Sequence, residues 1–210
     1  MKIVAALTDP AHVPLAQGQG ADLIELRLDL FGSDPAEKAK EALVGAALPV
    51  IATLRSSAEG GQFFGNADRW MEIIAPLVPL VAYVDVEQRF SMHAPAVRAA
   101  GKTVIASCHE GRMLSLSELF QTERNLRAYG DIPKIVVTPE DEDDVIDLIS
   151  FTTAAKKPVC TGTMGPHLRY ARAVLPLFGS EFVYCHTGNP TAAGQFSVAE
   201  FVQLRKILLS

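Results

Sequence analysis

The chain has 210 residues, of which 49% are hydrophobic and 20% are charged, and its formal net charge is -5 at pH 7. This length favours one large domain, and we expect residues 1–210 to form a single globular unit. The acidic balance gives no support to nucleic-acid binding, no apolar run reaches the roughly 18 residues that a membrane span needs, and no signal-peptide pattern is present.

Short strand-like runs recur along the whole chain, and most of them are rich in Val and Ile, as strands prefer. Their starts are spaced by roughly 20 to 30 residues, which is the length of a strand, a helix and two loops. The runs cover residues 2–7, 22–28, 49–54, 80–86, 102–107, 133–138, 158–163 and 181–187.

The segments between these runs mostly predict helices, with polar caps or a proline at the start and apolar residues at helical spacing. The first of the clear helices offers Ser33 or Asp34 as its cap and Pro35 in its first turn. Residues 12–20 give the weakest prediction, because they hold one proline and two glycines. Helices are predicted over residues 34–47, 115–130, 139–155 and 197–209.

Eight alternating strand and helix units in one chain predict a compact TIM (β/α)8 barrel, near the short end of the usual length range. A doubly wound open sheet is the alternative on pattern alone. No GxGxxG or GxxxxGK[ST] motif follows any of the strand-like runs, so an open nucleotide-binding sheet lacks its usual support.

Residues 24–30, IELRLDL, alternate apolar and charged side chains without a break. In a barrel, alternate strand residues point inward, so Ile24, Leu26 and Leu28 would meet the helices while the charged face looks into the interior. Charges in such a place must be paired or form a site. The polar side chains predicted to share inward faces are Glu25, Arg27, Asp29, Arg55, Tyr83, Asp85 and Glu87.

Lys134 lies near the start of an otherwise apolar strand, in DIPKIVVTP. Three explanations fit the local sequence: the side chain reaches the rim, pairs with an inward acid, or serves as a nucleophilic amine. Burial disfavours the charged ammonium form and so supplies the free amine that Schiff-base chemistry needs.

His109 ends the fifth strand, in VIASCHE, where an imidazole is well placed for general acid–base catalysis, although a rim histidine would look the same. Glu59 lies in the loop after the third strand and could fix the tautomer of His109, or simply be a solvated loop acid. Gly60 and Gly61 would let this loop turn tightly.

Arg172 opens the helix after the seventh strand, where it could grip a carboxylate or phosphate or be an ordinary surface residue. Thr191 and Gln195 follow the eighth strand and could donate hydrogen bonds to a ligand, or cap and turn the chain.

A metal enzyme is not favoured, since no two histidines have metal-ligand spacing and no HExxH motif or Cys/His cluster occurs. Cys108, Cys160 and Cys185 lie far apart in apolar runs. Reduced, packed thiols in a cytoplasmic protein are therefore expected.

Taken together, these motifs resemble type I 3-dehydroquinate dehydratase, the dehydroquinase of the shikimate pathway. The resemblance covers nearly the whole chain in one order, and TLRSSAEGG followed by a strand histidine and a strand lysine is its most specific part. The motifs that carry it are ELRLDLF, TLRSSAEGG, YVDVE, SCHE, PKIV, the MG and PLFGS block around Arg172, and the terminal AGQ.

The resemblance implies a barrel that is usually a homodimer, needs no metal or cofactor, and dehydrates 3-dehydroquinate to 3-dehydroshikimate, the third step of chorismate and aromatic amino acid biosynthesis. It implies that Lys134 forms an imine with the ring ketone, that His109 moves the protons, and that Glu59 orients His109. It also implies that Arg172 binds the substrate carboxylate beside Thr191 and Gln195. Ring hydroxyls would be held by Glu25, Arg27 and Arg55, and we expect Asp29 to brace an arginine.

The sequence departs from the family pattern at the substrate rim and lid, while both catalytic positions are kept. An N-terminal hairpin that closes some family barrels is not expected here. These departures bear on loop closure and ligand contacts more than on the reaction. The departing residues are Ala6, Glu110, Leu168, Ala171 and Ala193.

Two other classes of function stay open. One is another Schiff-base barrel, such as an aldolase-like lyase on a phosphorylated substrate, for which Gly162, Gly165 and Gly188 offer a weak phosphate loop. The other is a non-catalytic barrel that binds a small carboxylate, against which the intact pair of Lys134 and His109 argues.

Overall fold

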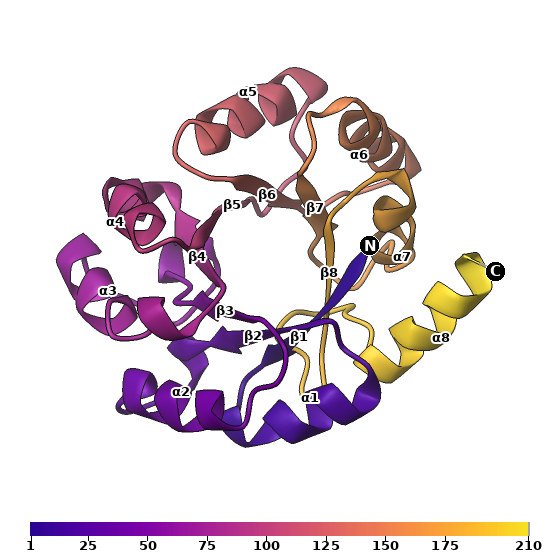
Figure 1. Cartoon of the computed structure of the whole chain (residues 1–210). Coiled ribbons are helices and arrows are strands. Elements are labelled where there is room, and N and C mark those ends of the chain that lie inside the picture. Colours follow the sequence, from indigo (N-terminus) through magenta and orange to yellow (C-terminus); the bar gives the residue numbers. More distant parts are fainter. Residues whose placement is uncertain (210) are drawn as a thin grey trace.

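The computed structural model describes residues 1–209, and its centre is a ring of eight parallel strands surrounded by helices (Figure 1). Each predicted run overlaps one strand, although five of the eight strands are shorter than predicted and β4, β5 and β6 each extend one or two residues beyond their runs. The strands are β1 (Lys2–Leu7), β2 (Leu23–Arg27), β3 (Val50–Thr53), β4 (Tyr83–Glu87), β5 (Thr103–His109), β6 (Ile132–Val137), β7 (Cys160–Thr163) and β8 (Phe182–Cys185).

The strand order follows the sequence around the ring, and β1 pairs with both β2 and β8. The ring closes between β7 and β8 through a short contact, in which Val159 bridges Ser180 and the Glu181 N–H donates to the Val159 carbonyl at 2.9 Å. The Ser180 hydroxyl strengthens this seam by accepting from the Thr161 N–H at 2.9 Å. These contacts confirm the predicted TIM barrel and exclude the open sheet.

Helices follow the strands and form the outer ring, with α8 reaching the C-terminus at the periphery (Figure 1). Ser115 and Ser197 each form a capping box, and Asp141 caps the helix after β6, as residues with acceptor side chains do at helix starts. The helices are α1 (Val13–Gln19), α2 (Pro35–Val44), α3 (Ala67–Ile74), α4 (Ala94–Ala99), α5 (Leu116–Arg127), α6 (Glu142–Ala154), α7 (Ala171–Val174) and α8 (Val198–Leu208).

Local structure differs from the sequence predictions in three places. The segment after β1 does form a helix, because Pro14 lies in its first turn and Gly20 ends it in the left-handed conformation with φ of 91°. Asp34 holds the cap position of α2, but its side chain makes no capping hydrogen bond. The second strand ends at Arg27, and Leu28–Leu30 form a 3₁₀ turn, so Asp29 leaves the strand row in which it was predicted.

The interior of the barrel changes from apolar to ionic along the strands. On β5 the inward residues run Ile105, Ser107 and His109, and on β2 Leu23 is followed by Glu25. The inward apolar layer fills the start of the barrel, so that polar groups meet from the middle of the strands to their carboxyl ends. That layer consists of Val4, Leu23, Ile51, Ile105, Ile132, Cys160 and Phe182.

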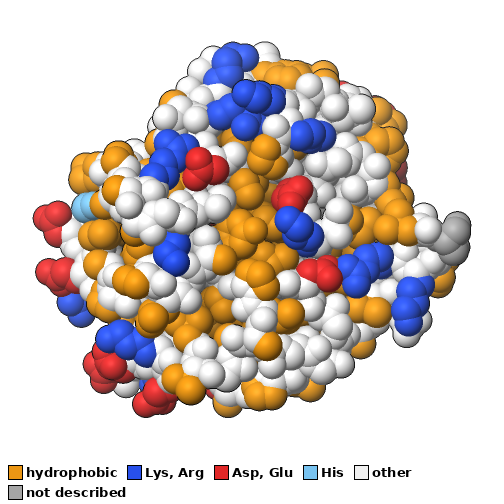
Figure 2. All heavy atoms as spheres, viewed as in Figure 1, with side chains coloured by type: hydrophobic (Ala, Val, Ile, Leu, Met, Phe, Trp, Pro, Cys, Tyr) orange, Lys and Arg blue, Asp and Glu red, His pale blue; other side chains and the backbone are white. Residues whose placement is uncertain are grey.

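Hydrophobic side chains gather over the middle of the face viewed in Figure 2, with charged side chains of both signs around them. None of the helices in the described part of the chain combines the length and the apolar character that a membrane crossing requires.

Candidate active site

A cavity of about 330 Å³ lies where the polar ends of the inward faces meet, which is the usual place for a site in this fold. All of the site residues predicted from the sequence line it. They are Glu25, Arg27, Arg55, Glu59, His109, Lys134, Arg172, Thr191 and Gln195.

Lys134 lies in the middle of β6 and is 4% exposed, so it does not reach the rim. Its Nζ lies 3.1 Å from Asp85 Oδ2 and 3.8 Å from Glu25 Oε1. The face of the Tyr184 ring is 4.0 Å from the same nitrogen, which is cation–π geometry. Of the three explanations for this lysine, pairing with an inward acid is confirmed, and the nucleophilic role stays a prediction.

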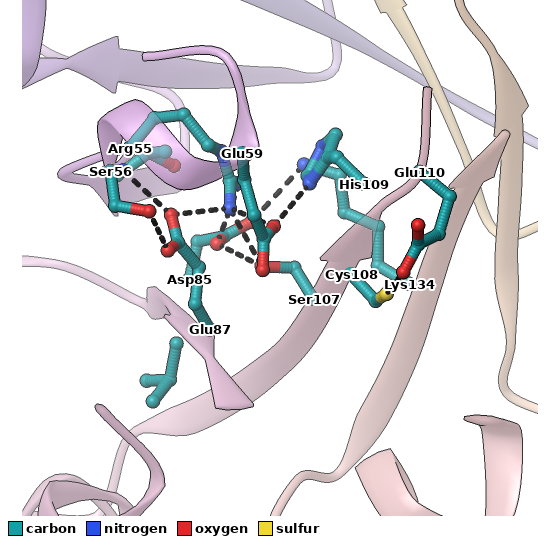
Figure 3. Close-up of polar contacts among 12 residues, drawn as sticks. Arg55, Ser56, Glu59, Asp85, Glu87, Ser107, Cys108, His109, Glu110 and Lys134 are labelled. Atoms are coloured by element: carbon teal, nitrogen blue, oxygen red, sulfur yellow. Dashed lines mark hydrogen bonds and ion pairs between the residues drawn. The ribbon is translucent and has the colours of Figure 1, made fainter. Parts of the chain in front are cut away.

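His109 ends β5 and is held by Glu59, which lies in a 3₁₀ turn after β3. His109 Nδ1 and Glu59 Oε2 are 2.8 Å apart (Figure 3). Burial raises the pKa of Glu59 to about 8, although Arg55 opposes the rise. Burial, together with the charges of Arg55 and Lys134, holds the pKa of His109 well below its usual range. The histidine is therefore neutral near pH 7, so one ring nitrogen is free to accept a proton, and the ionisation of Glu59 decides which nitrogen that is.

Arg55 is the centre of a buried ionic network (Figure 3). Its Nη1 donates to Glu87 at 2.9 Å, to Ser107 at 3.0 Å and to Glu59 at 3.1 Å, and its Nη2 donates to Asp85 at 2.8 Å. These acids raise the pKa of the guanidinium despite its burial. Arg55 reaches the cavity wall, but most of its hydrogen bonds hold the acids in place.

Arg27 forms a two-bond ion pair with Asp29, with Nε to Oδ1 at 2.9 Å and Nη2 to Oδ2 at 2.8 Å. This confirms the prediction that Asp29 braces an arginine. Asp29 also accepts from the backbone N–H groups of Arg55 at 3.4 Å and Gln62 at 3.2 Å. One buried carboxylate thus joins the loop after β2 to the loop after β3, and it needs the 3₁₀ turn to do so.

Arg172 lies in α7 at the cavity, where its Nη2 donates to the Ala193 carbonyl at 3.1 Å. Its Nε is buried without a hydrogen-bond partner, and burial lowers the pKa of the guanidinium to about 10. A half-buried cation whose buried donor is unsatisfied is costly unless an anion joins it. The arrangement therefore suits a ligand that carries a carboxylate.

Thr191 and Gln195 lie in the loop after β8 and bond to each other. Gln195 Oε1 accepts from the Thr191 N–H, and its Nε2 donates to Thr191 Oγ1, both at 2.8 Å. Gly194 has φ of 78°, and a Cβ there would lie 2.5 Å from the Gly165 carbonyl oxygen. The loops after β7 and β8 therefore pack tightly beside the cavity, and this packing requires glycine.

Sequence reasoning identified the cavity residues but assigned no role to the residues behind them. Asp85 and Glu87 were predicted to share a face, and Ser107 stands two residues before His109, so strand periodicity was the signal for all three. Tyr184 alternates with Phe182 on β8 in the same way. Their partners could not be found from local sequence.

Two departures from the family pattern have structural effects. Leu168 takes the place of a glycine and adopts φ of 53°, in the left-handed region that favours glycine. Ala171 is fully buried at the start of α7, where a serine hydroxyl would need a partner. Among residues 1–209, no group of three or more His, Cys, Asp or Glu side chains is arranged to hold a metal ion.

Comparison with known proteins places these features in one family. The profile of the type I 3-dehydroquinase family matches residues 7–209. The 3-dehydroquinate dehydratase of Methanoregula boonei is 60% identical over 208 residues, covering 99% of this chain and all of that protein, and that of Methanospirillum hungatei is 37% identical over 99% of this chain and 81% of its own length. The crystal structure of 3-dehydroquinate dehydratase from Aquifex aeolicus is 29% identical, covers 99% of this chain and 98% of its own, and has a TM-score of 0.85.

Proposed function

The chain belongs to the type I 3-dehydroquinase family, and we propose that it dehydrates 3-dehydroquinate to 3-dehydroshikimate through an imine on Lys134. One observation carries the mechanism: a buried lysine and a histidine backed by a carboxylate line the same cavity. Family membership favours this reaction over the aldolase-like alternative, and the two catalytic groups argue against a barrel that only binds a ligand.

Imine formation begins when the neutral amine of Lys134 attacks the ring ketone and water leaves. The resulting iminium withdraws electrons from the adjacent carbon, so the C2 proton becomes acidic enough for a neutral imidazole to remove. The low exposure of Lys134, 4%, supports this role because bulk water is kept from the nitrogen.

His109 is the proposed base, acting through Nε2. Glu59 occupies Nδ1 at 2.8 Å, so an ionised Glu59 fixes the tautomer that carries its proton on Nδ1 and leaves Nε2 free. The imidazolium formed by the proton transfer then donates to the departing C1 hydroxyl, and the electrons of the enamine complete the double bond. Water, activated by the same imidazole, releases the product and the free lysine.

The cavity wall provides the proposed substrate contacts. Arg172 has an unsatisfied buried Nε and would bind the carboxylate, with Thr191 and Gln195 beside it. Glu25, Arg27 and Arg55 reach the other side of the cavity and would hold the ring hydroxyls near Lys134. Family membership also supports a place for the enzyme in aromatic amino acid biosynthesis. We further propose that the protein is a homodimer, which light scattering would test.

The test is to incubate the protein with 3-dehydroquinate and borohydride and to locate the adduct by mass spectrometry. We expect a reduced adduct on Lys134 that is lost in Lys134→Ala and kept in Lys206→Ala, which changes an exposed lysine of α8. Without borohydride, enone absorbance should rise. If the unmodified protein gave neither an adduct nor a rise in enone absorbance, the proposed reaction would be refuted.

A further inference from the structure

Asp85 has no role among the residues assigned so far, yet its two carboxylate oxygens have separate partners (Figure 3). Oδ1 accepts from Arg55 Nη2 at 2.8 Å and from the Ser107 hydroxyl at 2.6 Å. Oδ2 accepts from Lys134 Nζ at 3.1 Å. The first oxygen is therefore anchored to the barrel, and the second points at the amine that the proposed function uses.

Asp85 acts from behind the cavity wall. It is 2% exposed and, unlike Lys134 and Glu25, is not among the residues that line the cavity. A substrate in the cavity would meet the lysine first, so any effect of this carboxylate on the reaction must pass through the nitrogen.

Titratable and charged groups face Lys134 from every side of the barrel. Asp85 is nearer to Nζ than Glu25 is, at 3.1 Å against 3.8 Å, and Glu25 also accepts from the Thr53 hydroxyl at 2.8 Å. The facing groups are Glu25 on β2, Glu59 after β3, Asp85 on β4, His109 on β5, Cys160 on β7 and Tyr184 on β8.

Asp85 keeps its negative charge at neutral pH. Burial alone would raise the pKa of this carboxyl, but Arg55 and Lys134 outweigh burial and lower the pKa. A carboxylate fixed by two other donors cannot follow a moving partner, so it defines where a cationic nitrogen is most stable.

We propose that Asp85 is the positioning residue of the imine-forming step, which fixes the place of Lys134 Nζ at the cavity wall and remains its counter-ion throughout. This inference rests on the proposed function. In net terms, the ammonium and the ketone give an iminium and water. A carbon–nitrogen double bond forms and the carbon–oxygen double bond breaks. The oxygen leaves as water with two of the nitrogen's protons, and one positive charge stays on nitrogen. Asp85 therefore faces a cation at the start and at the end of the step.

The decisive variant is Asp85→Asn, which removes the charge and keeps the shape. Losing an opposite charge at this distance disfavours the ammonium, so the pH at which borohydride trapping on Lys134 is half-maximal should fall by about one unit or more. The iminium loses the same support, so turnover at the plateau should fall by roughly tenfold or more. A residue that only stabilised the fold would lower the amount of active protein without moving the pH midpoint.

Glu87→Gln is the matched control. Glu87 lies on the same inward face of β4 and also binds Arg55, at 2.9 Å, but its remaining bonds are to Ser56 and not to the lysine. We expect this variant to lose turnover without moving the pH midpoint of trapping. A shift in Glu87→Gln equal to that in Asp85→Asn would overturn the proposal, because the effect would then belong to the whole network.

If Asp85→Asn does not fold, Asp85→Glu tests the proposal in its place. It restores the charge but moves the carboxylate by one methylene, so the pH midpoint should stay near that of the unmodified protein while trapping slows. Trapping at the unmodified rate in Asp85→Glu, or an unmoved midpoint in a folded Asp85→Asn, overturns the inference. Absence of any adduct in the unmodified protein instead refutes the proposed function, and this inference with it.

Discussion

The ionisation of Glu59 should control the rate of dehydration near neutral pH. Its carboxylate must be ionised to accept the Nδ1–H of His109, which leaves Nε2 free as the base. Burial raises the pKa of Glu59 to about 8, and while it is protonated the carboxyl donates to Nδ1 and forces the proton of the imidazole onto Nε2. That tautomer cannot accept the substrate's proton.

The size of the effect follows from this value. With a pKa of about 8, about a tenth of Glu59 is ionised at pH 7 and about nine tenths at pH 9. We therefore expect kcat/KM to rise about tenfold across these two units, through the fraction of free enzyme in the active form. The sign is fixed because the ionised carboxylate is the active form, and the raised pKa places its formation between pH 7 and pH 9.

The assay is kcat/KM from initial enone formation between pH 6 and 9, in the unmodified protein and in Glu59→Gln. The amide has no ionisation in this range, so the rise should disappear, and the rate at pH 9 should fall by roughly 10²-fold because the imidazolium loses its anionic partner. Adduct trapping on Lys134 should continue, since the hydrogen bonds of Glu59 are to Arg55 and His109 and not to that nitrogen. A flat pH profile in the unmodified protein, or the same rise in Glu59→Gln, would refute the reasoning.

Three further outcomes can be checked directly. His109→Ala should keep the trapped imine while turnover falls roughly 10²- to 10⁴-fold, and unchanged turnover would remove His109 from its role. Arg172→Ala should raise KM for 3-dehydroquinate roughly 10- to 100-fold, since one charged hydrogen-bond partner of the carboxylate is lost, and an unchanged KM would place the carboxylate elsewhere. Gly194→Ala should lower the free energy of unfolding, measured by urea titration, by about 1 to 3 kcal/mol and should also raise KM. The reason is that residue 194 has φ of 78° and that an added Cβ would lie 2.5 Å from the Gly165 carbonyl oxygen. An unfolding free energy and a KM equal to those of the unmodified protein would contradict this packing.

Local sequence was enough to predict the barrel and the cavity wall. Repeated strand and helix units favour one closed ring, and strand periodicity assigns each side chain to a face, so Lys134 and His109 could be placed inward before any contact was known. Glu59 as the partner of His109 was one of two open interpretations of its loop, and the family resemblance implied it.

Local sequence did not predict the backbone conformation of segments that depend on contacts with distant residues. Asp29 reads as the end of a strand, but its bonds to Arg27 and to backbone groups of the next loop favour a 3₁₀ turn. The helix at Val13–Gln19 has Pro14 and Gly20 as local signals, and it forms in spite of Gly18 because its buried residues Val13 and Ala16 also pack into the barrel core.

The sequence by itself therefore determined which side chains enter the barrel, because that depends on a period of two along each strand. Only the tertiary structure decided which of them meet. Arg55 follows β3, Asp85 lies on β4 and Lys134 lies on β6, and the distances of 2.8 Å and 3.1 Å that join them arise when the ring closes and the inward faces converge. Partner choice among buried charges is a property of that closure, since each cation takes the acid that the curvature of the sheet brings within reach.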